Sequence, residues 1–255
     1  MNLSLILPIY NAQEFIHDSL EKLVELLEKT EVPEIQVILV NDGSEDNTLE
    51  RINNFLQSYN GRIKFDLISY EKNRNIGFAI RQGIEKVKNE VVMIMDCDLP
   101  FKLDIVTQSL ILIRSCDMVT VDRTKKKESY NVGFLRFLLH RGLIFIIKII
   151  FGKYLRGIDD FVAGFKVIKK DLLDKIKHNL CSNTSLIHFE IILLTQLLNL
   201  KGANYKICFV YPYLNVDTNK FSTYSFAKII KTVMKILLEL IVIKINLRKI
   251  INERI

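Results

Sequence analysis

The chain has 255 residues, 49% hydrophobic and 25% charged, which is enough to build the core of one large α/β domain or two small ones. Four scattered cysteines without a C-x-x-C pair argue against a disulfide framework or a zinc site and favour reduced thiols in a cytosolic protein. The net charge of +7 is uneven, because residues 1–120 hold 12 Lys+Arg against 19 Asp+Glu and residues 121–255 hold 24 against 10. The basic residues of the second half alternate with long apolar runs, as at 143–151, which favours an anionic membrane surface over nucleic acid as a partner.

The first half alternates strand-like and helix-like segments. In chain order we expect a strand at 3–7, a helix at 13–28, a strand at 35–40, a helix at 46–58, a strand at 63–68, a helix at 77–88, and strands at 91–95 and 117–121. The first apolar run has no basic region before it and is interrupted by a proline, so we interpret it as a core strand and not a signal peptide. The alternation predicts an α/β fold, with a mostly parallel sheet and helices on both faces.

The second half is more apolar and more basic. We expect helical structure at 130–155, a strand at 162–168, and helices at 186–200 and 221–247. Neither of the long segments 130–155 and 221–247 has the about 20 mainly apolar residues that a membrane-spanning helix needs. Both are typical of amphipathic helices that lie on a membrane or pack on a partner, and ordinary core helices explain each segment about as well.

Two carboxylates follow the predicted strand at 91–95. Asp96 and Asp98 are spaced i and i+2, so on an extended chain both would point to the same side. Two like charges that close are costly unless a cation lies beside them, and Mg²⁺ or Mn²⁺ with oxygen ligands usually also takes substrate phosphates. The pair therefore predicts a metal and diphosphate site, although a solvated turn would explain the two residues on their own.

Polar side chains also follow the other predicted strands. Asp42 is a fixed acceptor for a nucleobase or ribose, whereas a turn and a helix cap explain residues 43–48. Arg74 stands before a predicted helix N-terminus, where anionic groups can bind.

These motifs together resemble family 2 glycosyltransferases with the GT-A (Rossmann-like) fold. The resemblance rests on P-x-Y-N at 8–11, N-D-G-S-x-D-x-T at 41–48, N-x-G-x-A at 75–79 and D-x-D at 96–98. Residues 160–166 (D-x-x-x-G-F-K), 188–193 and 220–224 further resemble the polyprenyl-phosphate branch that includes dolichol-phosphate mannosyltransferase. The resemblance implies a GT-A domain at 1–220, with an interface-helix insertion at 130–155, and a C-terminal amphipathic segment at 221–255.

The resemblance also implies roles for matching positions. A nucleotide-sugar donor would be bound by Asp96 and by residues of the first three motifs, namely Pro8, Tyr10, Asn11, Asp42, Asn75 and Gly77. Asp96 and Asp98 would hold Mg²⁺ or Mn²⁺. Arg123 would meet phosphate, or would be one more solvated charge, and Asp160 would stand on the acceptor side or organise a turn. Weaker candidates for the acceptor or phosphate site are Arg136, Arg141, Glu190 and Ser222.

The implied activity is metal-dependent, inverting transfer of a sugar to a polyprenyl phosphate by a protein held peripherally at the cytoplasmic face of a membrane. A polyprenyl phosphate is already largely ionised at pH 7, because its second pKa is roughly 6, and needs no general base. Transfer to a saccharide hydroxyl in surface polysaccharide synthesis is the alternative, and Asp160 would then be the base. A non-catalytic sugar-nucleotide-binding or scaffold subunit is the third, because Ala12 and Pro100 depart from the family pattern. A homo-oligomer is possible in each case.

Overall fold

A computed structural model describes residues 1–123, 134–155, 157–213 and 226–252, with side chains in helices α5 and α8 described from residues 141 and 231 onward. The strands are β1 (Leu3–Ile9), β2 (Ile35–Asn41), β3 (Lys64–Ser69), β4 (Val91–Ile94), β5 (Met118–Val121), β6 (Lys166–Lys169) and β7 (Ile207–Val210). The helices are α1 (Ile16–Glu28), α2 (Thr48–Ser58), α3 (Ile76–Ile84), α4 (Asp104–Leu112), α5 (Phe134–Phe151), α6 (Lys170–Ile176), α7 (Ile187–Leu200) and α8 (Phe226–Asn252), with 3₁₀ turns at Gly152–Tyr154 and Lys177–Asn179.

The described strands form one seven-stranded sheet in the order β3-β2-β1-β4-β6-β5-β7. Strands β1 to β4 pair in parallel, β6 runs antiparallel to both β4 and β5, and β7 is parallel to β5. The mostly parallel α/β sheet is confirmed. The carboxyl ends of β1 to β5 and the amino end of β6 consequently meet at one edge of the sheet.

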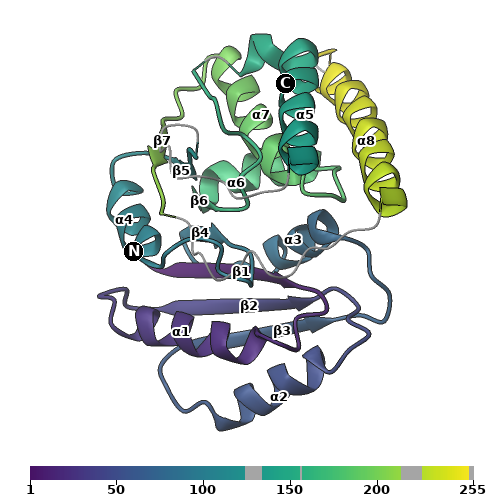
Figure 1. Cartoon of the computed structure of the whole chain (residues 1–255). Helices are drawn as coiled ribbons and strands as arrows, with labels where there is room; N and C mark the ends of the chain where they lie inside the picture. Colours follow the sequence, from purple (N-terminus) through teal and green to yellow (C-terminus); the bar gives the residue numbers. More distant parts are fainter. Residues whose placement is uncertain (124–133, 156, 214–225, 253–255) are drawn as a thin grey trace.

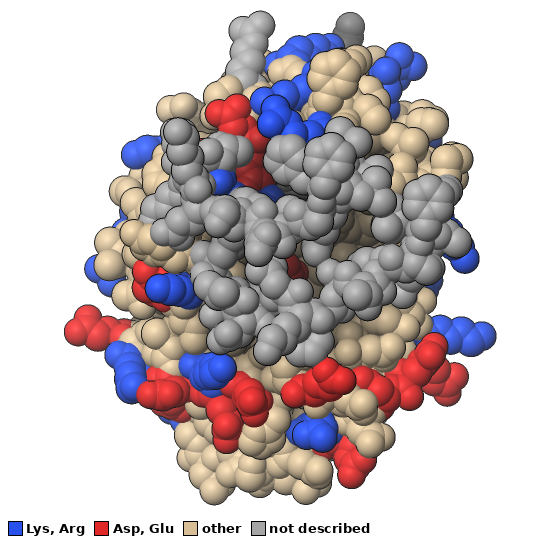
Figure 2. Space-filling view, in the orientation of Figure 1, with Lys and Arg blue, Asp and Glu red and all other residues tan. Residues whose placement is uncertain are grey.

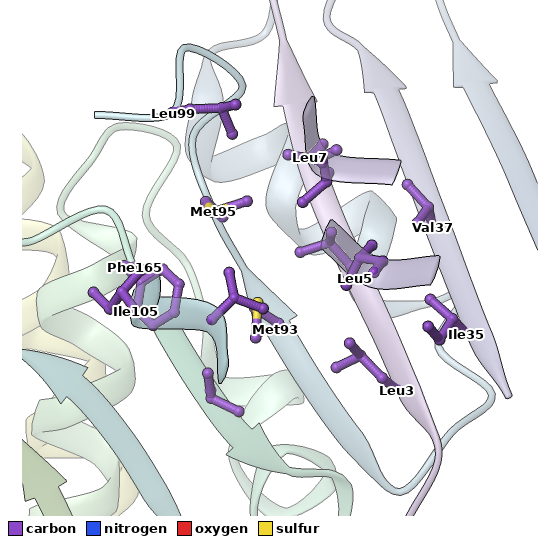
Figure 3. Close-up of a cluster of buried hydrophobic side chains, with 14 of the residues drawn as sticks. Leu3, Leu5, Leu7, Ile35, Val37, Met93, Met95, Leu99, Ile105 and Phe165 are labelled. Atoms are coloured by element: carbon purple, nitrogen blue, oxygen red, sulfur yellow. The ribbon is translucent and has the colours of Figure 1, made fainter. Parts of the chain in front are cut away.

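The inner strands of the sheet are buried on both faces, and their alternate side chains enter two different cores. Leu3, Leu5 and Leu7 of β1 join the core that is covered by α1, α2 and α4. Figure 3 shows these three side chains beside Met93 and Met95, with Ile105 and Phe165 farther from β1 in the same core. Ile6 joins the second core, under α3, α5, α6, α7 and α8, and Figure 1 shows the two helical layers on either side of the sheet.

Several boundaries differ from the sequence expectation. The expected helix 13–28 begins at Ile16, because 10–13 form a loop that is hydrogen-bonded to 44–48. The expected strand 162–168 begins only at Lys166, and Gly164 before it packs against the side chain of Asp96. Helices α4 and α6 and strand β7 were not expected.

The C-terminal helix α8 packs on the second core. Leu240, Ile243, Leu247 and Ile250 are buried there, and Lys201 Nζ donates a 2.8 Å hydrogen bond to the carbonyl oxygen of Ile250. In the part of the chain that the structure describes, no helix is both long and apolar enough to cross a bilayer. The domain boundary at 220/221 stays a prediction, and residues 221–225 lie outside the described ranges.

Candidate active site

The candidate site lies at the sheet edge where β1 and β4 diverge. Their ladder ends at the pair Ile6 and Ile94, and Met95 N donates to the Ile6 carbonyl at 3.2 Å. In a strand between two parallel neighbours, the backbone N and C=O groups of every second residue point to the same neighbouring strand. The groups of Ile6 point to β4, so the nitrogen of Pro8 also points to the β4 side, beyond the last pair of the ladder. A proline is tolerated there because no ladder hydrogen bond is lost. The strand order reverses at this point, and ligands of open α/β sheets bind in such a crevice.

The loops after β1 and β2 are joined by hydrogen bonds. Asn11, at φ 47°, donates its N–H to Ser44 Oγ at 3.0 Å and accepts the N–H of Glu45 on Oδ1 at 2.9 Å. Asp46 Oδ1 accepts the N–H of Thr48, the first residue of α2, at 3.0 Å, whereas Asn47 at the N-cap position makes no side-chain cap hydrogen bond. Asn11 is thus part of the loop scaffold, while Tyr10 beside it is 43% exposed and available to a ligand.

Asp42 is buried, and its carboxylate organises the loop after β3. Oδ1 accepts the Tyr70 hydroxyl at 2.6 Å and the N–H of Arg74 at 2.8 Å, and Oδ2 accepts Asn73 Nδ2 at 2.9 Å. Burial and the neighbouring Asp42 carboxylate raise the pKa of Tyr70, so its hydroxyl stays a donor. A nucleoside in this crevice would therefore meet an Asp42 whose orientation is already set.

Two glycines allow these loops to pack closely. A Cβ on Gly43, at φ +64°, would lie 2.5 Å from the backbone nitrogen of Asn73. A Cβ on Gly77 would lie 2.6–2.7 Å from backbone atoms of residues 182–184, and Gly77 N donates to the Asn183 carbonyl at 2.8 Å. Asn75 precedes α3 at φ 72°. The structure thus explains Gly77 by packing, and its role in donor binding stays a prediction.

Asp96 and Asp98 lie in a turn beyond the end of β4, so the expectation that an extended strand aligns them is wrong. They are nevertheless close enough to interact. Burial and the charge of Asp98 raise the pKa of Asp96 to about 7. Among the described residues, the buried Oδ1 of Asp96 has no hydrogen-bond partner. A buried carboxylate oxygen without a partner is costly, and a cation or a ligand donor would remove that cost.

The opposite wall of Asp96 is the backbone of Gly164. A Cβ on Gly164 would lie 2.1 Å from Oδ2 of Asp96, so only glycine leaves room for the carboxylate. The loop reaches this position because β6 is antiparallel to β4, with Lys166 paired to Ile94. The D-x-x-x-G-F-K segment therefore shapes the surroundings of the acidic pair.

Arg123 and Asp160 form a two-pronged ion pair beside this loop. Arg123 Nε lies 2.6 Å from Asp160 Oδ2, Nη2 lies 2.9 Å from Oδ1, and the N–H of Arg123 adds a third bond at 3.1 Å. Burial raises the pKa of Asp160, but the hydrogen bonds and charge of Arg123 outweigh it and hold the pKa below its usual value. A carboxylate with a lowered pKa is a poor general base at neutral pH, so the geometry does not support the base role expected for a saccharide acceptor.

Two buried residues near the site were missed by the sequence reasoning. Lys166 is fully buried, and its Nζ donates to the carbonyls of Ala163 at 2.7 Å and Phe165 at 3.3 Å. His188 is buried in α7, and within the described residues neither of its ring nitrogens has a hydrogen-bond partner. Burial lowers the pKa of both residues, that of Lys166 to about 7. The only signal for Lys166 was its place in the D-x-x-x-G-F-K segment.

Of the weaker acceptor candidates, the structure describes the side chains of Glu190 and Arg141. Glu190 accepts the N–H groups of Cys181 and Ser182 at 2.9–3.1 Å, so its carboxylate holds the loop before α7. Arg141 is exposed on α5. The side chain of Arg136 and all of Ser222 lie outside the described residues.

The residues at the β4 end fit a divalent cation. They supply hard carboxylate oxygens, among them the buried Oδ1 of Asp96, which has no hydrogen-bond partner among the described residues. Two protein ligands suit Mg²⁺ or Mn²⁺, which keep further positions for waters and substrate phosphates.

Comparisons with known proteins identify the family of the chain. The family model "Glycosyl transferase family 2" matches residues 4–177. The poly-beta-1,6-N-acetyl-D-glucosamine synthase of Staphylococcus epidermidis is 35% identical over 96 residues, which are 38% of this chain and 21% of the relative. A dolichyl-phosphate beta-glucosyltransferase of Trichomonas vaginalis is 29% identical over 178 residues, 65% of this chain and 51% of the relative. The chain thus spans about a fifth to a half of these curated relatives.

A solved structure has the same fold. Glucosyl-3-phosphoglycerate synthase from Mycobacterium tuberculosis, crystallised with Mn²⁺, UDP-glucose and phosphoglyceric acid, superposes with a TM-score of 0.63 at 14% identity, over 95% of this chain and 79% of that one. The GT-A fold expected from the motifs is confirmed, and the chain belongs to glycosyl transferase family 2.

Proposed function

We propose that the chain transfers a sugar from a nucleotide-sugar donor to a polyprenyl phosphate, with inversion at the anomeric carbon. The observation that carries the proposal is the acidic pair Asp96 and Asp98 at the strand-order reversal, with a buried carboxylate oxygen that lacks a protein partner among the described residues. Such a site suits a metal-bound diphosphate.

The donor would lie across the ends of β1, β2 and β4. Asp42 would accept from the nucleoside and the exposed Tyr10 would contact it, with Asn11 and Asn75 shaping the surrounding loops. Asp96 and Asp98 would hold Mg²⁺ or Mn²⁺. When bound, the cation would neutralise the charge on the departing diphosphate. The Mn²⁺ complex of the structural neighbour supports use of a divalent cation in this fold.

The reaction would be a single displacement. An oxygen of the acceptor phosphate forms a bond to the anomeric carbon while the bond from that carbon to the diphosphate oxygen breaks, and the nucleoside diphosphate leaves with the electron pair. The acceptor is already largely ionised at pH 7, since its second pKa is about 6, so no proton has to be removed. Asp160 would hold the guanidinium of Arg123, which would position phosphate.

Transfer to a saccharide hydroxyl is the second candidate, and the match to a polysaccharide synthase favours it. A hydroxyl acceptor needs a base in the transition state. The ion pair with Arg123 argues against Asp160 in that role, which is why we prefer the phosphate acceptor.

The test is a donor screen with UDP-, GDP- and dTDP-sugars, with Mg²⁺ or Mn²⁺, and with a short polyprenyl phosphate or an oligosaccharide in detergent, scored by product mass. Asp98→Asn should lower transfer by at least about a hundredfold, because the diphosphate charge loses its counter-ion site. The matched control is Asp104→Asn, an exposed carboxylate on α4, which should transfer at the wild-type rate.

Each outcome selects one proposal. A lipid phosphate that has gained one glycosyl group supports the first candidate, and a glycosidic product on the oligosaccharide without a lipid product replaces it by the second. Binding of donor and Mn²⁺ without transfer to either acceptor would select a non-catalytic subunit, and full activity of Asp98→Asn would overturn the metal assignment.

A further inference from the structure

Helix α8 carries two apolar faces. The inner face consists of Leu240, Ile243, Leu247 and Ile250, which are at most 7% exposed and pack into the second core. Ser182 Oγ and Thr184 Oγ1 donate to Glu239 Oε2 at 2.8 Å and 2.6 Å and fix the rotation of the helix about its axis. The opposite side of the described helix must therefore face away from the sheet.

That opposite side is not polar. Its large side chains are 50–59% exposed, and we call them the outer apolar face: Met234, Leu238, Ile241, Val242 and Ile245. Met234, Leu238, Ile241 and Ile245 follow one another at spacings of four, three and four residues, and Val242 lies four residues after Leu238, so all five lie along one stripe of an α-helix. Scattered exposed apolar residues are normal on proteins, whereas a continuous stripe indicates a contact surface.

The charges around this stripe have one sign. From residue 231 to 252 the exposed charged side chains are Lys231, Lys244, Arg248 and Lys249, and the partly exposed Lys235 adds a fifth cation. The single acid in this range is Glu239, and it is turned toward the 182–184 loop. Figure 2 shows that most acidic side chains visible on the molecule lie across its lower half, whereas Figure 1 places α8 in the upper half.

We propose that the outer apolar face of α8 binds the surface of an anionic lipid bilayer, with the helix axis parallel to the membrane plane. The five apolar side chains enter the boundary between headgroups and acyl chains, and the surrounding cations contact anionic headgroups. No described helix is able to cross a bilayer, so the contact is peripheral. A second copy of the chain is a poorer occupant, because a two-fold contact through this face brings cations opposite cations.

The lipid contact goes beyond the proposed glycosyl transfer. Only its consequence for the position of the acceptor rests on that proposed function. If the acceptor is a polyprenyl phosphate, its phosphate lies at the headgroup level to which α8 holds the domain. Binding to lipid itself needs neither donor nor acceptor, so the two proposals are tested separately.

The experiment is flotation of the full chain with vesicles of phosphatidylcholine alone or in an equimolar mixture with phosphatidylglycerol. We expect binding to the mixed vesicles that weakens as salt is added. The double variant Ile241→Ser/Ile245→Ser should lower the partition coefficient at least about tenfold, because two half-exposed apolar side chains lose their transfer into lipid. Its matched control is Ile111→Ser/Leu200→Ser, which changes two equally exposed residues on other helices.

A second pair of variants separates local charge from net charge. Lys244→Gln/Arg248→Gln/Lys249→Gln should weaken binding to the mixed vesicles on the order of a hundredfold, at about fivefold per cation. The control Lys22→Gln/Arg51→Gln/Arg114→Gln removes the same net charge from exposed positions elsewhere and should bind nearly as the wild type does.

Three results would overturn the inference: no binding to mixed vesicles, equal loss in the variants and their controls, or a concentration-dependent dimer that Ile241→Ser/Ile245→Ser abolishes. Transfer in detergent to a short polyprenyl phosphate should be unchanged in all of these variants. Failed flotation with intact transfer would reject only the lipid contact, and intact flotation without transfer would reject only the proposed activity.

Discussion

Gly164→Ala tests whether the loop before β6 shapes the surroundings of Asp96. The added Cβ would lie 2.1 Å from Asp96 Oδ2 and 2.8 Å from its Cγ, whereas ordinary van der Waals contact begins at 3.4 Å. The carboxylate or the loop must therefore move by about 1.3 Å to restore contact distance, and overpacking of this kind costs about 1–3 kcal/mol. A displacement near 1 Å of a group that positions the reacting atoms lowers rates on the order of a hundredfold.

Two measurements check this expectation. Transfer rates should fall about a hundredfold, and electron paramagnetic resonance of Mn²⁺ should show weaker binding to the variant in the absence of donor. The matched control is Gly152→Ala, because a Cβ there meets no atom within 4 Å. If Gly164→Ala folds, binds Mn²⁺ and transfers sugar as the wild type does, then Asp96 is not held against this wall during catalysis and the site assignment fails.

Three further changes probe the buried polar groups. His188→Leu should keep or raise the free energy of unfolding at pH 7, since neither ring nitrogen has a partner among the described residues. Burial lowers the pKa of His188 below 6.5, so below that pH the unfolded state takes up a proton that the folded state excludes, and the wild type loses up to about 1.4 kcal/mol per pH unit. Urea titrations should show this slope reduced in the variant, and an unchanged slope would contradict the reasoning. Asp160→Asn should cost about 3 kcal/mol at pH 7, because Arg123 stays partly buried without its partner. The folded pKa of Asp160 lies below 3.8, so the difference from wild type should be full above that pH and vanish as the pH falls through the folded pKa. Asp159→Asn, whose side chain is 61% exposed, is the control and should cost less than about 1 kcal/mol; equal costs would refute a stabilising buried pair. Glu239→Gln should lower the free energy of unfolding by about 2 kcal/mol through weaker bonds to the 182–184 loop, as measured by urea unfolding; wild-type stability would show that these bonds do not stabilise the packing of α8.

Strands β1, β2 and β4 of the parallel part of the sheet could be predicted because they are buried on both faces. Continuous Val/Ile/Leu runs at β1 and β2 leave little choice of structure, and the polar residues that follow them mark where each strand ends. The position of Asp42 at a strand end followed directly from this pattern. Its hydrogen bonds from Tyr70, Asn73 and the N–H of Arg74 could not be predicted, because they depend on where the next loop returns.

The antiparallel part could not be predicted in the same way. Strand β6 has four residues and β7 four, too short to show a period, and α6 begins directly where β6 ends. The burial of Lys166 is set by its position between β4 and β5, which local sequence does not reveal. A lysine is normally expected to be exposed to solvent, and only the order of the strands shows that Lys166 is buried.

The different surroundings of Asp96 and Asp160 explain why two nearby acids would serve different purposes. Both are affected by burial, which raises the pKa of a carboxylate, and both feel the charges of Lys166 and Arg123. Asp160 gains three hydrogen bonds from Arg123 and stays ionised, whereas Asp96 faces Asp98 and keeps an oxygen without a protein donor among the described residues. An ionised, saturated carboxylate can orient an arginine but accepts a proton poorly, whereas an unsaturated one beside a second acid attracts a cation. Transfer at this site is consequently better matched to an acceptor that arrives already ionised than to one whose proton must be removed.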